Sequence, residues 1–259
     1  MRFREYLLED SAKLESVFKK IAENCKQFLD MSHDCPIYRG LGRSSPAKFI
    51  RTPVNRESTD LSDELTFLMD TIIFDKFEIQ NIRSKCFFGT GDEEMAAGYG
   101  YPYYIFPTNG FKFVWSPEIH DPYDQFISTI LIHFAEKLKE HGFKIDADDL
   151  EEILGFSDMT SSIKYAKDPS ILLRKPLEET IEKLFLPFLI NGNLDRTVNL
   201  FSQTLFELGD SLKYSNMDLD SAIKSGVEIM FVGCRGYYTV PVKANVTYTE
   251  ILQEIKKYL

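Results

Sequence analysis

The stretch Arg83-Ser84-Lys85-Cys86-Phe87-Phe88-Gly89-Thr90-Gly91, followed by the segments 95–100 and 103–107, decides the fold. Its order of apolar run, polar turn, small-residue run and second apolar run predicts a strand, a tight turn, a short helix and another strand. Thr90 lies between two glycines, so the backbone of the turn can approach a ligand without interference from Cβ atoms. We therefore expect a strand-rich core with a ligand-facing turn at Thr90.

Outward from this centre, the remaining segments divide into strand-forming and helix-forming regions. Apolar and β-branched runs predict further strands, which begin at residue 37 or span 111–115, 227–232 and 237–242. Two glycine-containing connections, Asn109-Gly110 and the segment 233–236, are typical of hairpin turns. The segment 43–59, rich in Ser, Thr, Pro and Arg, predicts an ordered loop. Helical periodicity predicts helices over 10–30, across most of 123–222 and over 248–258. The fold class expected is therefore α+β.

The overall charge excludes one broad class of function. The chain has 259 residues and a net charge of −10, which argues against a general electrostatic binder of nucleic acid. A local basic groove remains open, since Lys48, Arg51 and Arg56 lie near Arg39 in the sequence. No apolar run approaches the roughly 20 residues that a membrane-spanning helix needs.

The cysteines and histidines give no sign of a metal site. The four cysteines are scattered without a C-x-x-C pair, which suits free thiols in a reducing compartment. The four histidines show no H-E-x-x-H or similar ligand spacing. We expect no metal.

Three residues carry a resemblance to a known enzyme family. Arg39 ends a short apolar run, Thr90 occupies the central turn, and Glu228 begins the strand-forming run Gly226-Val227-Glu228-Ile229-Met230-Phe231-Val232. In this order, an arginine, a hydroxyl and a glutamate, each on or beside a strand, resemble the arginine-serine-glutamate class of mono-ADP-ribosyltransferases.

The resemblance implies NAD as the substrate and a role for each of the three residues. Arg39 would hold NAD through paired charge-assisted hydrogen bonds. Glu228 would be catalytic, because a fixed carboxylate stabilises the positive charge that develops on the ribose when the nicotinamide bond breaks. Thr90 would orient Glu228 and support the ribose. The implied NAD-binding residues are Arg39, Gly40, Gly89, Thr90, Tyr99, Tyr103 and Tyr104.

The sequence departs from the family pattern in ways that leave the acceptor open. Glycines replace the hydroxyl residues that flank the middle position of the family's turn, and Gly226 stands where arginine-directed members have a glutamate. A host protein, a nucleic acid or water all remain possible acceptors. The helical block 123–222 is also larger than the family core requires.

The resemblance also implies an architecture. The fold expected is an ADP-ribosyltransferase-like split β-sandwich with an N-terminal helix and a large helical insertion. The core would comprise residues 10–122 and 223–259, and the insertion residues 123–222.

The first nine residues carry a second resemblance. Residues 1–9 are short, amphipathic and end in Leu7-Leu8-Glu9. They are similar to the capsid-targeting peptides of internal head proteins in T-even-like tailed phages, which a prohead protease removes. The alternative is that they form the first turn of an ordinary helix. The phage resemblance implies location in the phage head and, after injection, in the host cytoplasm.

Two other interpretations of the chain remain. It could be a catalytically inactive ADP-ribosyltransferase-like internal head protein or host-factor binder. It could also be a toxin of bacterial origin, in which case residues 1–9 would stay uncleaved.

Overall fold

The computed structural model describes residues 11–53, 70–119 without 71, 72, 75 and 81, scattered positions from 132 to 142, positions 207 and 210, and 212–259 without 211 and 245. The chain divides into two units. The sheet unit comprises Met1–Asn55, Lys85–His120 and Ser215–Leu259, and the second unit comprises Arg56–Ser84 and Asp121–Tyr214. Residues 1–9 and most of the predicted helical block 123–222 lie outside the described residues.

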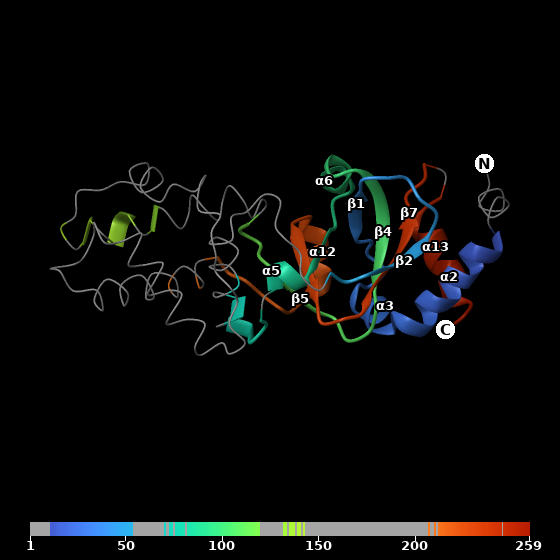
Figure 1. The fold of residues 1–259 in the computed structure, drawn as a ribbon, viewed down its shortest axis with the longest axis horizontal. Coiled ribbons are helices and arrows are strands. Elements are labelled where there is room, and N and C mark those ends of the chain that lie inside the picture. The colour runs from blue at the N-terminus through green and yellow to red at the C-terminus, as the bar shows by residue number, and fades with distance from the viewer. Residues whose placement is uncertain are drawn as a thin grey trace. The chain divides into compact units, whose positions relative to one another are not determined.

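The sheet unit is built on an antiparallel sheet of seven strands, which confirms the α+β class (Figure 1). Their order across the sheet is β2-β7-β4-β1-β3-β6-β5. The strands are β1 (Tyr38–Leu41), β2 (Lys48–Arg51), β3 (Phe87–Thr90), β4 (Tyr101–Pro107), β5 (Lys112–Trp115), β6 (Glu228–Val232) and β7 (Gly236–Pro241).

The sheet folds over between β1 and β3. These two strands share one registered pair, Tyr38 with Thr90, whereas the other neighbouring strands share at least four. The ring of Phe87 on β3 stacks on Tyr237 of β7 at a centroid distance of 4.3 Å, although two strands lie between β3 and β7. A four-strand half (β2, β7, β4, β1) therefore faces a three-strand half (β3, β6, β5), and aromatic rings fill the space between them.

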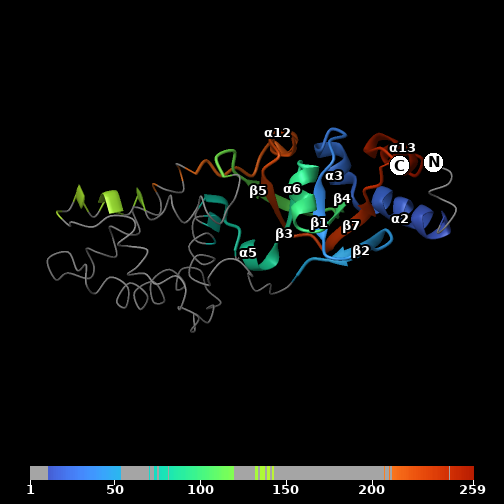
Figure 2. The same cartoon turned by 90° about the horizontal axis from the view of Figure 1, so that it is seen from above.

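Three helices pack on the outer side of the four-strand half. They are α2 (Ser11–Asn24), α3 (Lys26–Met31) and α13 (Tyr248–Lys256). Tyr248 of α13 contacts the rings of Tyr104 and Phe106 on β4, and Phe28 of α3 meets Phe106 edge to face. Figures 1 and 2 show α2 and α13 side by side at one end of the sheet unit. A capping box of Thr247 and Glu250 starts α13, and it satisfies two backbone N–H groups at the helix N-terminus.

Two shorter helices lie next to the strands that carry the predicted site. Helix α6 (Glu93–Gly98) begins at Asp92, whose side chain accepts hydrogen bonds from the backbone N–H groups of residues 94 and 95. Helix α12 (Leu219–Ser225) is capped by Asp218 at its N-terminus and by Gly226 at its C-terminus, shortly before β6. Gly226 takes the left-handed conformation, with φ of 72°, which is the usual way for a helix to end on glycine.

The second unit is described only at scattered positions. Asp70 is buried and accepts a hydrogen bond from the backbone N–H of Arg83, which lies in α5 (Ile82–Lys85). Lys137 pairs with Glu207 at 3.2 Å. No helix among the described residues of either unit is long and apolar enough to span a membrane.

Both predicted hairpins are wrong. Strand β4 pairs with β1 and β7, whereas β5 pairs with β6, so the turn at Asn109-Gly110 crosses from one half of the sheet to the other. The segment 233–236 makes a second crossing, from β6 to β7. The two turns pack together, because a Cβ on Gly233 would lie 3.2 Å from the carbonyl oxygen of Gly110. The turn residues thus predict that the chain reverses direction, but they do not predict which strands pair with each other.

The segment predicted as a loop over 43–59 contains a strand. Lys48–Arg51 forms β2, which pairs with β7 at the edge of the sheet. Its short apolar pair is flanked by basic residues, a pattern typical of an edge strand. Pairing with a strand that lies far away in the sequence decides its conformation, and local composition does not reveal it.

Candidate functional site

Strands β1, β3 and β6, which carry Arg39, Thr90 and Glu228, are consecutive in the sheet. Tyr38 is in register with Thr90, and Thr90 is in register with Glu228. Directly opposite residues of antiparallel strands project on the same face with their Cβ atoms about 4.5–5.5 Å apart. A row of Tyr38, Thr90 and Glu228 therefore crosses three strands where the sheet folds over.

Thr90 connects the end of β3 to the chain just before Glu228. Its side chain is 6% exposed. The hydroxyl donates to the carbonyl oxygen of Gly226 at 2.6 Å and accepts from the backbone N–H of Asp92 at 3.0 Å. The donated bond thus holds the segment that leads into β6, and the accepted bond holds the turn between β3 and α6. Thr90 positions Glu228 through the backbone.

The glycine two residues before Glu228 has a structural role. Gly226 has a φ of 72°, which side chains rarely adopt, and a Cβ there would lie 3.4 Å from the Cβ of Asp92. A glutamate at this position would strain the backbone at the end of α12. The departure from the arginine-directed pattern is therefore tied to how α12 ends.

Arg39 lies between the two halves of the sheet. Its Nη1 donates to the carbonyl oxygen of Phe88 on β3 at 2.6 Å, and its guanidinium lies 5.7 Å from the ring centre of Tyr237 on β7. Its Nε is buried and has no hydrogen-bond partner among the described residues. Successive residues of a strand project on opposite faces, so the Arg39 side chain leaves β1 on the face opposite Tyr38.

The two glycines predicted to bind NAD pack closely against protein atoms. A Cβ on Gly40 would lie 2.2 Å from the carbonyl oxygen of Ala96, so this glycine lets α6 approach β1. A Cβ on Gly89 would lie 2.6 Å from Cγ2 of Ile37 and 2.8 Å from Cδ1 of Ile105. Both positions therefore need glycine for helix and core packing.

The three predicted tyrosines lie in different environments. Tyr103 is 1% exposed, and its hydroxyl accepts a hydrogen bond from the backbone N–H of Ser45. Tyr104 is buried, and its ring lies 5.3 Å from that of Tyr38 and 5.1 Å from that of Tyr248. Tyr99 follows α6 and is 65% exposed. Of the three, Tyr99 presents its ring to solvent.

Tyr38 is a residue of this site that the sequence analysis did not single out. Burial raises the pKa of its hydroxyl, and the negative charge of Glu93 at the start of α6 raises it further. Glu93 is thus a second carboxylate near the row of Tyr38, Thr90 and Glu228. Glu93 follows Thr90 by three residues in the sequence, and this short spacing could have identified it as a residue near the candidate site.

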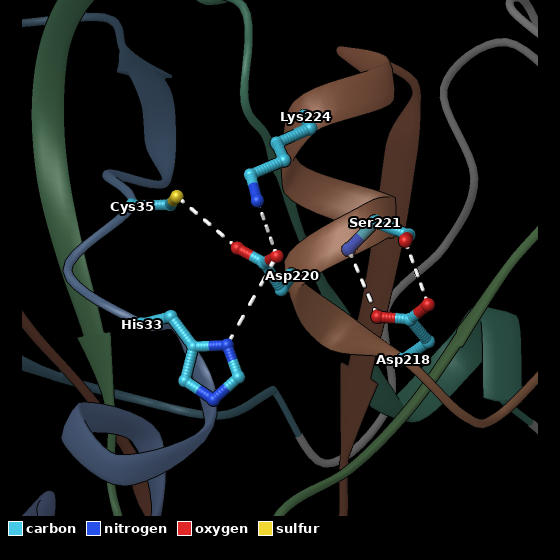
Figure 3. A network of polar contacts seen from close by, with 6 residues as sticks. All are labelled: His33, Cys35, Asp218, Asp220, Ser221 and Lys224. Atoms are coloured by element: carbon cyan, nitrogen blue, oxygen red, sulfur yellow. Dashed lines mark hydrogen bonds and ion pairs between the residues drawn. The ribbon is translucent and has the colours of Figure 1, made fainter.

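A polar network joins the segment before β1 to the helix before β6 (Figure 3). Asp220 of α12 accepts a hydrogen bond from Sγ of Cys35 at 3.2 Å and another from Nζ of Lys224, and Nδ1 of His33 lies 4.0 Å away. The hydrogen bond from Lys224, followed by that from Cys35, lowers the pKa of Asp220. Burial, followed by the bond to Asp220, raises the pKa of Cys35.

This network connects the segment before β1 with the helix before β6, and these are the strands that carry Arg39 and Glu228. Asp218 holds the first turn of α12 by accepting from the backbone N–H and the hydroxyl of Ser221. Asp220 then ties that turn to Cys35, four residues before Arg39. In the described part of the chain, no group of three or more His, Cys, Asp or Glu side chains is arranged to hold a metal ion.

No protein-family model matches the sequence, and comparison with curated proteins and with solved structures found no match.

Proposed function

We propose that this chain is an NAD-dependent mono-ADP-ribosyltransferase. The observation that carries the proposal is the adjacency of β1, β3 and β6, with Thr90 and Glu228 in register. The adjacency of the three strands supports a common site where the sheet divides. Thr90 and Glu228 project on one face there, and Arg39 leaves β1 on the other face and reaches β3 through its hydrogen bond to Phe88.

The finer fold assignment is part of the same proposal. An ADP-ribosyltransferase-like split β-sandwich requires two sheet halves that separate near the site. The single registered pair between β1 and β3, and the stacking of Phe87 on Tyr237 across the two halves, support this assignment.

The side chains present suit NAD as a substrate. The Nε of Arg39 is a buried donor with no partner among the described residues, and such a donor is costly unless something accepts from it. A pyrophosphate or ribose oxygen would satisfy it with a charge-assisted hydrogen bond. The observed contact to Phe88 uses Nη1, so Nε is the atom to which we assign this role.

Glu228 supplies the chemistry in this proposal. The bond between C1′ of the ribose and the nicotinamide nitrogen breaks, and its electron pair leaves with nicotinamide. The carboxylate of Glu228 stabilises the positive charge left on the ribose. A nucleophile of the acceptor then forms a bond to C1′ and gives up its proton. Thr90 keeps Glu228 in place through Gly226.

The setting of the reaction is proposed from residues 1–9. Their resemblance to capsid-targeting peptides supports packaging in a phage head, cleavage after Glu9 by a prohead protease, and action in the host cytoplasm. N-terminal sequencing of the protein from purified particles tests this: a chain that begins at Asp10 is expected, and an intact Met1 would contradict it.

The decisive experiment compares labelling from NAD by the wild type and by Glu228→Gln. Purified protein is incubated with labelled NAD and a bacterial lysate, and the label is traced by protease and nuclease digestion. Glu228→Gln should lose labelling by several orders of magnitude at unchanged thermal stability. Glu254→Gln, the same change on α13 at an exposed pair with Lys257, is the control and should label normally. Full activity in Glu228→Gln would overturn the proposal.

One observation favours a second candidate, a protein that keeps the fold but not the chemistry. The Thr90 hydroxyl is already engaged with Gly226 and Asp92, and both flanking residues of the turn are glycines. An inactive internal head protein or host-factor binder would show no labelling and no thermal shift with NAD. Stabilisation by NAD would exclude this candidate.

A further inference from the structure

Two hydroxyl groups at the junction of α3 and α13 are buried without a hydrogen-bond partner in the protein. Ser32, the residue that caps the end of α3, is 1% exposed, and Tyr248, the first residue of α13, is 7% exposed. Neither Oγ of Ser32 nor the hydroxyl oxygen of Tyr248 has a hydrogen-bond partner among the described residues. Most buried polar side chains bond to protein or to ordered water, because a buried hydroxyl without a partner is costly. The two hydroxyls therefore point to a bound molecule that supplies the missing hydrogen bonds.

The two hydroxyls are neighbours in the fold. The N–H of Ser32 donates to the carbonyl oxygen of Phe28, whose ring meets Phe106 edge to face. The ring of Phe106 in turn stacks on that of Tyr248 at a centroid distance of 6.0 Å. Burial raises the pKa of Tyr248, the charge of Asp34 raises it further, and the Ser32 hydroxyl lowers it. The two oxygens thus lie near each other, although they form no direct hydrogen bond.

Other polar side chains near the Tyr248 hydroxyl are engaged elsewhere. Asp34 and Cys35 both act on the pKa of Tyr248. Asp34 accepts from Nζ of Lys256 with both carboxylate oxygens, at 3.0 and 2.9 Å. The thiol of Cys35 donates to Asp220 at 3.2 Å. These two neighbours therefore do not satisfy the buried hydroxyls.

We propose that a water molecule is bound inside the fold between Ser32 and Tyr248 and bridges their hydroxyls. Internal waters typically make about three hydrogen bonds to buried polar groups that otherwise have no partner. Each hydroxyl can donate one hydrogen bond and accept others, so the pair offers the water both a donor and an acceptor. The water joins the end of α3 to the start of α13.

Water fits this position better than an ion or a larger molecule. An anion would lie close to the negative charge of Asp34, which already acts on Tyr248. Protein sites for divalent metals use several carboxylate, imidazole or thiolate ligands, and the described residues contain no cluster of three such side chains. A larger molecule would need an opening to solvent, whereas both side chains are more than nine-tenths buried.

The bridging water strengthens the connection that leads into β1. Two contacts of side chains already hold the segment 32–35, which leads from α3 toward that strand. Cys35 donates to Asp220 of α12 (Figure 3), and Asp34 pairs with Lys256 of α13. The bridged hydroxyls add a third contact, again with α13. This inference is independent of the proposed function, because it concerns how the chain before β1 is held.

Deleting each hydroxyl tests whether it has a partner. Removal of a buried hydroxyl that bonds to nothing leaves stability unchanged or raises it, whereas removal of one that bonds to water lowers it. Tyr248→Phe and Ser32→Ala should therefore each unfold at a lower urea concentration than the wild type at neutral pH. A urea midpoint equal to or above that of the wild type in either variant would overturn the inference.

Magnetic relaxation dispersion of the water oxygen nucleus distinguishes a bridging water from a direct bond between the hydroxyls. The method counts water molecules that stay inside the protein for long times. Tyr248→Phe should hold about one such water fewer than the wild type. A lower urea midpoint with an unchanged number of internal waters would overturn the inference, since the two hydroxyls would then bond to each other.

Thr239→Val is the matched control for both measurements. Thr239 is 0% exposed, and its hydroxyl donates directly to the carbonyl oxygen of Lys48 at 3.2 Å. This variant should lose stability and keep the wild-type number of internal waters. If it lost a water as Tyr248→Phe does, the loss could not be assigned to the pair of Ser32 and Tyr248, and the inference would fall.

Discussion

Thr90 and Glu228 face each other across β3 and β6, and the Thr90 hydroxyl reaches past its partner to the carbonyl oxygen of Gly226 at 2.6 Å. The glutamate is thus held from two sides, by the ladder of the sheet and by a side-chain bond to the preceding helix end. Buried hydroxyls in such bonds are sensitive to isosteric replacement, because a lone carbonyl is left behind.

Thr90→Val should therefore lower the free energy of unfolding by about 1–3 kcal/mol, whereas Thr90→Ser, which keeps the hydroxyl, should lose less. Urea denaturation measures both. On the proposed function, labelling from NAD should fall in Thr90→Val by more than the loss of folded protein explains. Equal stability in the two variants would show that the bond to Gly226 contributes nothing.

Gly226→Ala should destabilise the protein by about 1–2 kcal/mol, because alanine resists the left-handed conformation that ends α12. Gly98→Ala is the control, since its φ is ordinary and no atom lies within 4 Å of the added Cβ. Gly98 is the last residue of α6, so that change should be neutral or stabilising. Similar urea midpoints for the two variants would contradict the role assigned to Gly226.

Asp220 should make stability depend on pH in the acid range. Its pKa is lowered in the folded state, so its contribution is present above the unfolded pKa of about 3.9 and is lost as pH falls below that value. Asp220→Asn should be less stable than the wild type at neutral pH, and the two should converge in acid. Urea midpoints measured across this range give the comparison.

Lys224→Met provides the cross-check on that interpretation. It removes the largest cause of the low pKa of Asp220 and should shift the acid loss of stability to higher pH. A wild-type pH profile in this variant would show that Asp220 is not the group that titrates.

Arg39→Lys should weaken the use of NAD more than it weakens folding. Lysine keeps the charge but has no Nε donor and no planar group to lie over Tyr237. On the proposed function, KM for NAD should rise about tenfold or more with a smaller change in kcat. Arg51→Lys, on the edge strand, is the control, and steady-state labelling measures both. An unchanged KM would remove Arg39 from the site.

The sequence indicated which segments form strands better than it indicated their neighbours. The strands β1, β3, β4, β5, β6 and β7 lie where alternating and continuous apolar runs predicted them, because those runs fill the core. Pairing depends on contacts between remote segments, and for this reason both glycine turns were wrongly assigned to hairpins. The edge strand β2 was missed because its two apolar residues give little periodic signal.

The residue types of the candidate site come from the sequence, and the fold decides how those residues are placed. Arg39, Thr90 and Glu228 lie on neighbouring strands, an arrangement that their spacing in the sequence does not reveal. Burial of Tyr103 and Tyr104 follows from β4 lying inside the sheet, and nothing local distinguishes these tyrosines from the exposed Tyr99. Neither Tyr38 nor the network around Asp220 stood out in the sequence, since each depends on contacts across the fold.

The crossing of the chain between the two sheet halves has a consequence for how the protein is made. Strand β3 pairs with β6, and β4 pairs with β7, yet both partners follow only after the long segment 116–227. Contacts of such large sequence separation form late, so the apolar strands 87–90 and 101–107 must wait for their neighbours during synthesis. Glu228 arrives on the strand that closes the sheet. Until β6 and β7 have been synthesised, a growing chain therefore lacks both the closed sheet and Glu228.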